Sequence, residues 1–412
     1  MTIPIELAVG PDTWTVAVPP DKLRRLHRAT LPVSGAEVRR GSPRELMLAA
    51  LDTPLGIDAP VRRAVTPDDK IAVVLDEGLP LIPELLAALL DHLAPAGITP
   101  AAVTVLVPPG GNSAWVDDLA DEYADLTVES HDPEAEPKVE YVDTTKAGRR
   151  VYLNRTLADA DFKIVLTGRR YDPTAGHGGA EAAIFPALSN GETRAAFVGQ
   201  FAVGPPASVP NALRAEAGEV AWLLGTPVFV EVIEGPGDTV AEVVVEFRVH
   251  PPLATVEGVR RQDARWRFTA PDAAELVIAA VGGDPRRVTF QDLAQALSTA
   301  ARCCTSDGRV VLLSAANPPR GEGADLLRGA DDAERVGRRL GKRKPDDWPA
   351  AALWADAAQR CSLFVAAGWA DDLTEELFAT PLHTAAEVQR LIAAADSVLV
   401  IPDAHKTAVD TP

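Results

Sequence analysis

The residues with the richest chemistry follow one apolar stretch near the middle of the chain. Arg169 and Arg170 precede Asp172, His177 and Glu181, all within thirteen residues. Guanidinium groups match the geometry of carboxylates and phosphates, while carboxylates and imidazole bind divalent metals or exchange protons. The cluster therefore indicates an anion site or a metal site, with Asp172, His177 and Glu181 as ligands or as acid and base. The alternative is a solvated loop in which the arginines pair with the neighbouring carboxylates.

Two glycine pairs accompany these polar residues. Gly178-Gly179 lies inside the cluster, and Gly110-Gly111 follows an earlier apolar run. Glycine lets the backbone approach a ligand closely, but it also serves any tight turn. Gly178 and Gly179 are therefore candidates for contacting a cofactor, if there is one, and the turn interpretation stays open.

The elements that must position this cluster alternate between short apolar runs and helical patterns. This rhythm is typical of βαβ units with a mainly parallel sheet flanked by helices. We expect strands at 71–75, 103–107, 163–167, 275–281, 310–314, 363–366 and 397–401, and helices at 83–93 and 291–302. The sequence therefore predicts an α/β fold.

The segment 226–247 breaks this rhythm. Two β-rich runs flank Gly235-Pro236-Gly237-Asp238, which predicts a β-hairpin in the first domain. The alternation resumes after Arg260-Arg261. We expect an N-terminal domain over 1–262, a C-terminal α/β domain over 273–412 and a hinge near 263–272.

The segments that leave the predicted strands are rich in glycine, proline and polar residues. In open parallel sheets, ligands bind outside the carboxyl ends of the strands. The sequence thus predicts a ligand cleft between the two domains, with ordinary turns as the alternative. The segments are 76–78, 108–112, 168–170, 282–285 and 317–319.

Composition and charge exclude several classes of partner. A chain of 412 residues is too long for one ordinary core. The formal charge of −19 argues against binding nucleic acid or an anionic membrane, because Lys and Arg must neutralise phosphates there. No basic region followed by an apolar run opens the chain, and no run approaches the roughly 20 apolar residues of a membrane span. We expect a cytoplasmic protein, and its oligomeric state stays open.

The sequence offers no metal-binding pattern of its own. The three cysteines, Cys303, Cys304 and Cys361, form no Cys/His metal spacing. We expect them to be small buried hydrophobic residues.

The stretch 171–186 reads YDPTAGHGGAEAAIFP, and its frame resembles a known cofactor loop. Ala175-Gly176, Gly178-Gly179 and Pro186 resemble the tethering signature of the nickel-pincer lactate racemase family. Similar segments stand in the family's order along almost the whole chain, at 49–56, 131–132, 144–161, 282–291, 321–323 and 401–404. The resemblance implies two domains with the active site between them.

The resemblance also implies a chemistry whose residue types are missing here. The family attaches a nickel-pincer nucleotide to a lysine, binds the nickel with a histidine and moves the substrate proton with two more histidines. By position, the lysine corresponds to Glu181 and the nickel-binding histidine lies near Phe197. The proton-transferring histidines correspond to Asn112 and Asp172.

The remaining family positions are only partly kept. Asp76 is retained and is a catalytic candidate by position, but the arginine that follows it in the family is replaced by Leu79. Gln291 is retained, whereas the lysine three residues later corresponds to Ala294.

A count that needs no alignment supports these losses. No lysine lies between Lys163 and Lys342, and no histidine lies between His177 and His250. No local shift restores the tether or the metal ligand, so the sequence argues against nickel-pincer catalysis.

Three functions follow as expectations. The first is a lactate-racemase-like protein without that catalysis, which keeps a cleft for a small anion such as a 2-hydroxy acid. The second is a divergent isomerase that acts on a hydroxy acid or sugar acid with another metal or none. The third is a non-catalytic interaction protein whose cleft is vestigial and filled by side chains. Either Trp348 or Trp354 corresponds to the family's pocket tryptophan, with a buried interface residue as the alternative.

Overall fold

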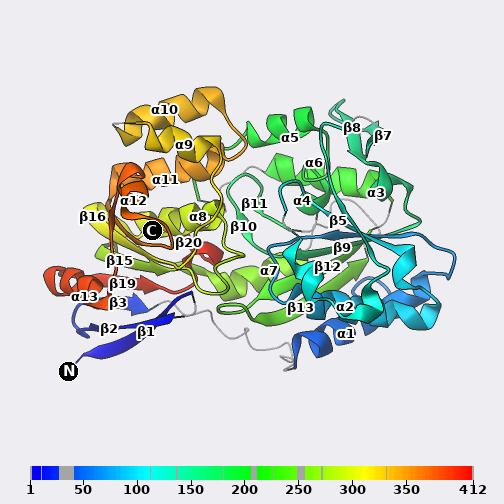
Figure 1. Cartoon of the computed structure of the whole chain (residues 1–412), viewed down its shortest axis with the longest axis horizontal. Helices are drawn as coiled ribbons and strands as arrows, with labels where there is room; N and C mark the ends of the chain where they lie inside the picture. Colours follow the sequence, from blue (N-terminus) through cyan, green and yellow to red (C-terminus); the bar gives the residue numbers. More distant parts are fainter. Residues whose placement is uncertain are drawn as a thin grey trace.

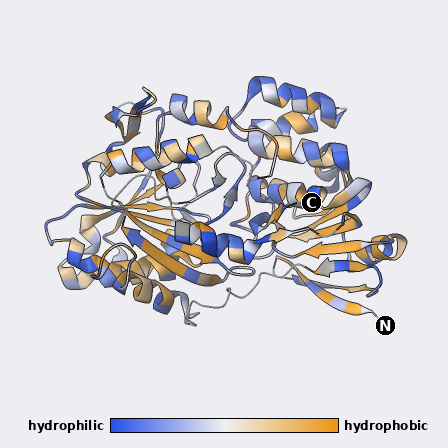
Figure 2. Ribbon diagram, turned by 180° about the vertical axis from the view of Figure 1, so that it is seen from behind, coloured by the Kyte–Doolittle hydropathy of each residue, from blue (hydrophilic) through white to orange (hydrophobic). Residues whose placement is uncertain are grey.

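A computed structural model shows two α/β halves side by side, each built around a six-stranded sheet (Figure 1). It describes residues 2–10, 12–26, 41–111, 113–135, 138–179, 181–205, 211–225, 227–247, 256–270, 272–330 and 332–410. The predicted α/β class is confirmed. Apolar residues lie along the strands of both sheets, and polar residues gather on the outer faces of the helices (Figure 2).

The first sheet has the strand order β13-β12-β9-β4-β5-β6. Its strands are β4 (Ile71–Leu75), β5 (Val103–Val107), β6 (Thr127–Ser130), β9 (Phe162–Gly168), β12 (Val228–Glu234) and β13 (Val240–Phe247). All neighbours are parallel except β12 and β13, which form the predicted hairpin. The predicted strands at 71–75, 103–107 and 163–167 are confirmed.

Helices cover both faces of this sheet, whose central strand β4 is apolar throughout. β4 is buried at every residue. On one face, α1 (Pro43–Asp52) and α2 (Ile82–Leu93) pack over Val73, Val105 and Ile164. On the other, α3 (Arg155–Asp159), α4 (Glu181–Ile184) and α6 (Asn211–Leu223) pack over Ala72, Val74 and Leu106. This two-sided burial explains why these strands read as continuous apolar runs rather than as alternating ones.

The second sheet is parallel throughout and has the order β18-β17-β16-β15-β19-β3. Its strands are β3 (Leu23–Leu26), β15 (Ala274–Ala280), β16 (Cys304–Leu313), β17 (Ser362–Ala366), β18 (Ala379–Pro381) and β19 (Val398–Ile401). The four strands predicted in this half are confirmed, within a few residues at their ends.

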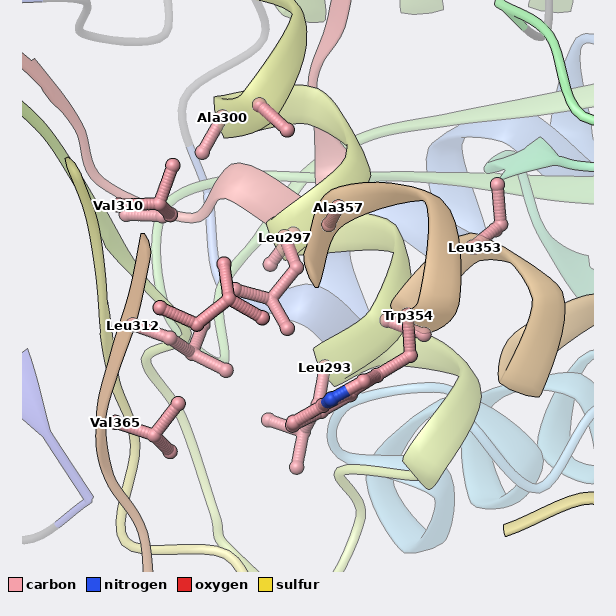
Figure 3. Packing of buried hydrophobic residues seen from close by; sticks show 14 of the residues in the cluster. Leu293, Leu297, Ala300, Val310, Leu312, Leu353, Trp354, Ala357 and Val365 are labelled. Atoms are coloured by element: carbon pink, nitrogen blue, oxygen red, sulfur yellow. The ribbon is translucent and has the colours of Figure 1, made fainter. Parts of the chain in front are cut away.

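The main core of the second half lies between this sheet and two neighbouring helices that run in the same direction (Figure 3). α8 (Phe290–Arg302) starts with a capping box, in which the Thr289 hydroxyl accepts from the Asp292 amide and the Asp292 carboxylate accepts from the Thr289 amide. Its buried face, with Leu293 and Leu297, meets β16 and α11 (Trp348–Arg360). The three cysteines are buried, as expected.

The first residues of the chain belong to the second half. β1 (Ile3–Val9) and β2 (Asp12–Val18) form an antiparallel hairpin whose apolar side packs on the second sheet beside α13 (Ala385–Ala394). β3 extends that sheet by pairing with β19. The strands within residues 3–26 therefore pack with the second half, whereas the prediction placed residues 1–262 in one N-terminal domain. The domain division near 263–272 stays a prediction.

Smaller elements complete the chain. A hairpin of β7 (Val139–Thr144) and β8 (Arg150–Asn154) flanks the first sheet, and β14 (Arg267–Thr269) pairs with β20 (Ala408–Asp410) where the halves join. The remaining helices are α5 (Gly191–Val198), α7 (Val256–Trp266), α9 (Glu322–Arg328), α10 (Ala333–Arg343) and α12 (Asp371–Glu376). Within the described residues, no helix has the length and apolar character to cross a membrane.

Truncating the core of the second half tests this packing. We expect Leu297→Ala to lower the free energy of unfolding of that half by about 2–5 kcal/mol, because the cavity it leaves among β16 and α11 cannot fully close. Urea denaturation followed by circular dichroism measures it. The matched control is Leu55→Ala, whose side chain is exposed. Equal stabilities for the two variants would contradict the packing.

Candidate functional site

A cavity of about 310 Å³ lies where the two halves meet, and we call it the central cavity. The first half contributes Asp76, Gly78, Gly168, Arg170, Asp172 and Glu234. The second half contributes Gly282, Arg287, Gln291, Asp292, Gln295 and His405. Asp76, Glu234 and Gly282 lie at the carboxyl ends of parallel strands β4, β12 and β15, which is the position that the sequence predicted for a pocket.

The electrostatic centre of the cavity is Glu234, the last residue of β12. Its side chain is 3% exposed, and Arg170 Nε donates to its Oε1 at 2.7 Å. From the second half, Lys406 Nζ lies 3.0 Å from Oε2 and Arg287 Nη2 lies 4.0 Å from it. Burial by itself raises the pKa of Glu234, but Arg170 and Lys406 outweigh it and hold this pKa well below the ordinary value. The carboxylate is therefore ionised and shared by both halves.

The loop after β4 forms a second junction between the halves. Asp76 accepts hydrogen bonds from the amides of Gly78 at 2.9 Å and Gly168 at 3.2 Å. These bonds turn the Gly78 carbonyl toward the cavity, where Arg170 donates to it from the first half. Arg287 Nη1 donates to the same oxygen from the second half at 3.1 Å. One carbonyl thus binds an arginine from each half.

The turn between β12 and β13 is the third junction. Lys406 Nζ donates to the carbonyls of Gly235 at 3.1 Å and Gly237 at 2.5 Å. The Gly237 amide donates to Asp403 Oδ1 at 3.1 Å. The predicted hairpin turn is therefore a docking element for the second half.

Asp172, a candidate site residue from the sequence, lines the cavity. Its Oδ1 accepts from the amides of Thr174 at 2.7 Å and Ala175 at 2.6 Å, which folds the loop back on itself. Burial raises its pKa above the ordinary value despite these bonds. Gly178 and Gly179 also line the cavity, but a Cβ at Gly179 would lie 2.4 Å from the Gly168 carbonyl oxygen. Packing of the loop on β9 is sufficient to require that glycine.

His177 lies away from the cavity lining, on the other side of the loop. Its Nε2 is 2.9 Å from Asp263 Oδ1 on α7, and the Tyr171 hydroxyl donates to the same oxygen at 2.7 Å. Burial raises the pKa of Asp263, but the hydrogen bonds from His177 and Tyr171 outweigh it and keep that pKa low. The structure thus places His177 in a link between the loop and α7.

Arg169 also points away from the cavity, because neighbouring residues of an extended chain face opposite sides. Its side chain is 1% exposed and pairs with Glu231, where Arg169 Nη2 lies 2.9 Å from Oε1. Arg169 Nη1 donates to the Gly178 carbonyl at 3.1 Å. Of the two predicted substrate-binding arginines, Arg170 alone reaches the cavity.

The positions that hold the reactive residues in the resembled family are occupied by packed side chains. Glu181, at the tether position, is 3% exposed, and its Oε1 lies near Gly218 of α6 rather than in the cavity lining. Phe197 stacks edge-on with Phe185 at 6.1 Å. Leu79 and Ala294 are fully buried. Asn112 lies outside the described residues.

The second half supplies cavity residues that sequence reasoning missed. Gln291 was predicted and lines the cavity, but Arg287 and His405 were not predicted. Both follow segments whose family resemblance was visible, at 282–285 and 401–404, so their place after a strand end was the available signal. The sequence held no such signal for Glu234 and Lys406, because each residue forms its ion pairs with residues far away in the sequence.

The two candidate tryptophans, Trp348 and Trp354, are packed against other parts of the protein. Trp348 lies between the halves, where its Nε1 donates to the Val198 carbonyl at 3.1 Å. Trp354 is fully buried, and its Nε1 donates to the Leu377 carbonyl at 2.7 Å. Neither side chain lines the central cavity. No group of three His, Cys, Asp or Glu side chains within the described part of the chain is arranged to hold a metal ion.

Comparison with known proteins finds a family model that matches part of the first half and two solved structures with a similar fold. Residues 17–197 match the lactate racemase N-terminal domain. The lactate racemase apoprotein from Thermoanaerobacterium thermosaccharolyticum has a TM-score of 0.80 and 18% identity, covering 99% of this chain and 100% of that chain. A protein from Thermotoga maritima has a TM-score of 0.67 and 12% identity, covering 91% and 100%. At these identities the two structures show a shared fold. No curated protein matches the chain.

The buried pair of Arg169 and Glu231 generates a test of its structural role. We expect Glu231→Gln to destabilise the first half by about 3–5 kcal/mol, because it leaves the Arg169 charge buried without its counter-ion. The double variant Arg169→Met/Glu231→Leu should recover most of that loss, since neither charge remains. Urea denaturation of both variants measures the difference. A double variant no more stable than Glu231→Gln would show that the pair has another role.

Proposed function

We propose that this chain, whose residues 17–197 match the lactate racemase N-terminal domain, binds a small organic anion in the central cavity without a tethered nickel-pincer nucleotide. The residues that stand where the tether and the metal ligand are expected argue against nickel-pincer catalysis.

The observation that carries the proposal is a pair of unsatisfied donors on the second half. Arg287 and Gln291 both line the cavity, and Arg287 Nε and Gln291 Nε2 have no hydrogen-bond partner among the described residues. Buried donors in folded proteins are almost always paired. Two donors on one wall call for an acceptor with two oxygens, which a carboxylate supplies.

Net charge contributes little to this recognition. Arg170, Arg287 and Lys406 pair with Glu234, Asp76 and Asp238 in one network, and Asp172 and Asp292 also line the cavity, so no excess of positive charge remains. Hydrogen bonds to the unpaired donors, rather than an excess of positive charge, therefore supply the affinity. This balance favours a small carboxylate over a polyphosphate, whose charges would need more cations.

The residues present do not fit the family's cofactor. A tether needs an amine nucleophile, whereas the tether position holds Glu181, whose carboxylate lies near α6. Nickel favours imidazole ligands, whereas the expected position holds the buried Phe197. No step of the proposed function passes through that group.

A vestigial cleft is the less favoured alternative, because it would be filled by side chains. The cavity instead keeps about 310 Å³ and a polar lining from both halves. A divergent isomerase that uses the same cavity is compatible with anion binding, and activity assays separate the two.

Binding of a carboxylate is tested by calorimetric titration with lactate and with malate. We expect Arg287→Met to weaken the affinity about tenfold or more, because a charge-assisted hydrogen bond contributes about 1.5–3 kcal/mol. The neighbouring Arg286→Met is the matched control, since that side chain is 83% exposed and pairs with Asp284. Equal weakening by both substitutions, or no binding of either acid, would refute the site.

The absence of a tether is tested separately by intact mass and metal analysis of the purified full chain. We expect the mass of the unmodified 43.6 kDa polypeptide and no stoichiometric nickel, because the loop 171–186 contains no lysine. The positive control is a lactate racemase prepared in the same cells. A nucleotide-sized mass increment on any lysine of this chain would contradict the proposal.

A further inference from the structure

We infer that the ligand of the central cavity is an amino carboxylate, whose ammonium group binds the carboxylate of Asp172. The inference rests on the proposed anion site, where Arg287 and Gln291 bind the ligand's own carboxylate, and it specifies the second charged group of that ligand. Asp172 thereby becomes a specificity-determining residue, and a simple acid without an ammonium group becomes a weaker ligand.

The charges of the cavity leave two carboxylates without a matching cation. Three cations, Arg170, Arg287 and Lys406, are matched by three carboxylates within their own network. Asp172 and Asp292 line the same cavity in addition. A simple carboxylate would add a third negative charge to these two, and like charges repel strongly in a site shielded from water. A ligand that carries its own positive charge avoids this repulsion.

Of these two carboxylates, Asp172 is the one without a cation nearby. Burial lowers the pKa of Arg170, but the neighbouring carboxylates, Asp292 among them, outweigh it, so Asp292 already faces a positive charge. Burial raises the pKa of Asp172, and no cation of the described residues counteracts that shift. A positive charge at this carboxylate would stabilise its ionised form. Asp172 therefore lacks the counter-ion that Asp292 has.

Asp172 also keeps one oxygen for a ligand. Its Oδ1 accepts from the amides of Thr174 and Ala175, which hold the carboxylate at the turn between the paired segments 171–172 and 176–177. Its Oδ2 accepts no hydrogen bond from the described residues. The side chain is partly exposed where it lines the cavity. A ligand in the cavity thus meets this oxygen in the conformation that the structure shows.

An ammonium group matches what Asp172 offers. An ionised carboxylate only accepts hydrogen bonds and an ammonium group only donates them, and a bond between two such ions is about twice as strong as one between neutral groups. Arg287 and Gln291 present donors from the second half, whereas Asp172 presents an acceptor from the first half. An amino carboxylate therefore bridges the two halves through groups of opposite charge. The volume of about 310 Å³ limits it to a small molecule.

The test compares ligands with and without the ammonium group, by calorimetry on the full chain at neutral pH. Alanine is compared with propionate and with lactate, which has nearly the shape of alanine but no positive charge. The pair of 4-aminobutyrate and butyrate covers a longer separation of the two charged groups. We expect the wild-type protein to prefer the amino acid in at least one of these sets by about tenfold or more, the ratio that corresponds to 1.4 kcal/mol.

Asp172→Asn removes the negative charge and keeps the Oδ1 acceptor for the two loop amides. This variant should reduce the ratio to about one, and it should raise the affinity for the simple acid because one repelling charge is gone. Asp172→Glu, which keeps the charge, should retain part of the preference. The matched control is Asp117→Asn, whose side chain is exposed, and it should leave all affinities unchanged.

The outcomes separate the inference from the proposed function. Equal binding of amino and simple acids by the wild-type protein in every set would overturn the role of Asp172 while the anion site stands. Binding of none of the ligands would overturn the anion site itself, and so would binding of ethylamine as tight as that of alanine. Equal loss of both affinities in Asp172→Asn would show that the residue only supports the loop. The wild-type comparison decides the inference even where that variant fails to fold.

Discussion

One buried carboxylate determines how the two halves meet. Glu234 ends the last parallel strand of the first sheet and is bound by Arg170 from its own half and by Lys406 from the other. Removing such a charge from water is costly unless it is fully paired, so the halves must approach closely enough to supply the second cation. Because Lys406 pairs with Glu234, the short 3-10 helix η8 (Ala404–Lys406) lies at the edge of the cavity. Arg287 approaches the same carboxylate from the second half. The cavity and the junction are therefore parts of one ionic network.

The fold was largely predictable because it depends on local patterns. Continuous apolar runs such as 71–75 indicate a strand that is buried on both faces, and the Gly-Pro-Gly-Asp segment indicates the turn of a hairpin. The N-terminal strands were not predicted, because β3 is completed by β19 far along the chain. No local signal carries that pairing, and the same holds for the two-residue strands β10 (Tyr171–Asp172) and β11 (Gly176–His177).

The site was predictable in position but only partly in membership. The cavity lies at the strand ends, and four of the candidate residues, Asp76, Arg170, Asp172 and Gln291, line it. Arg169 and Arg170 are neighbours in an extended segment, so their side chains face opposite sides. Only one of the two can therefore reach the cavity. Which of the two enters depends on Glu231 and Glu234, which lie more than sixty residues later. Spacing alone therefore could not assign the arginines.

The N-terminal hairpin gives the protein an unusual order of assembly during translation. β3 is translated well before its partner β19, and Ala17 precedes its side-chain partner by 372 positions. At about 5–20 residues per second, the ribosome separates the two by roughly 20–75 s. Until β15 and β16 have been translated, the apolar side of the hairpin has no sheet to pack on, and β3 has no partner strand until β19 follows. An uncovered strand edge is a template for unwanted pairing, so β3 is open to such pairing throughout that interval.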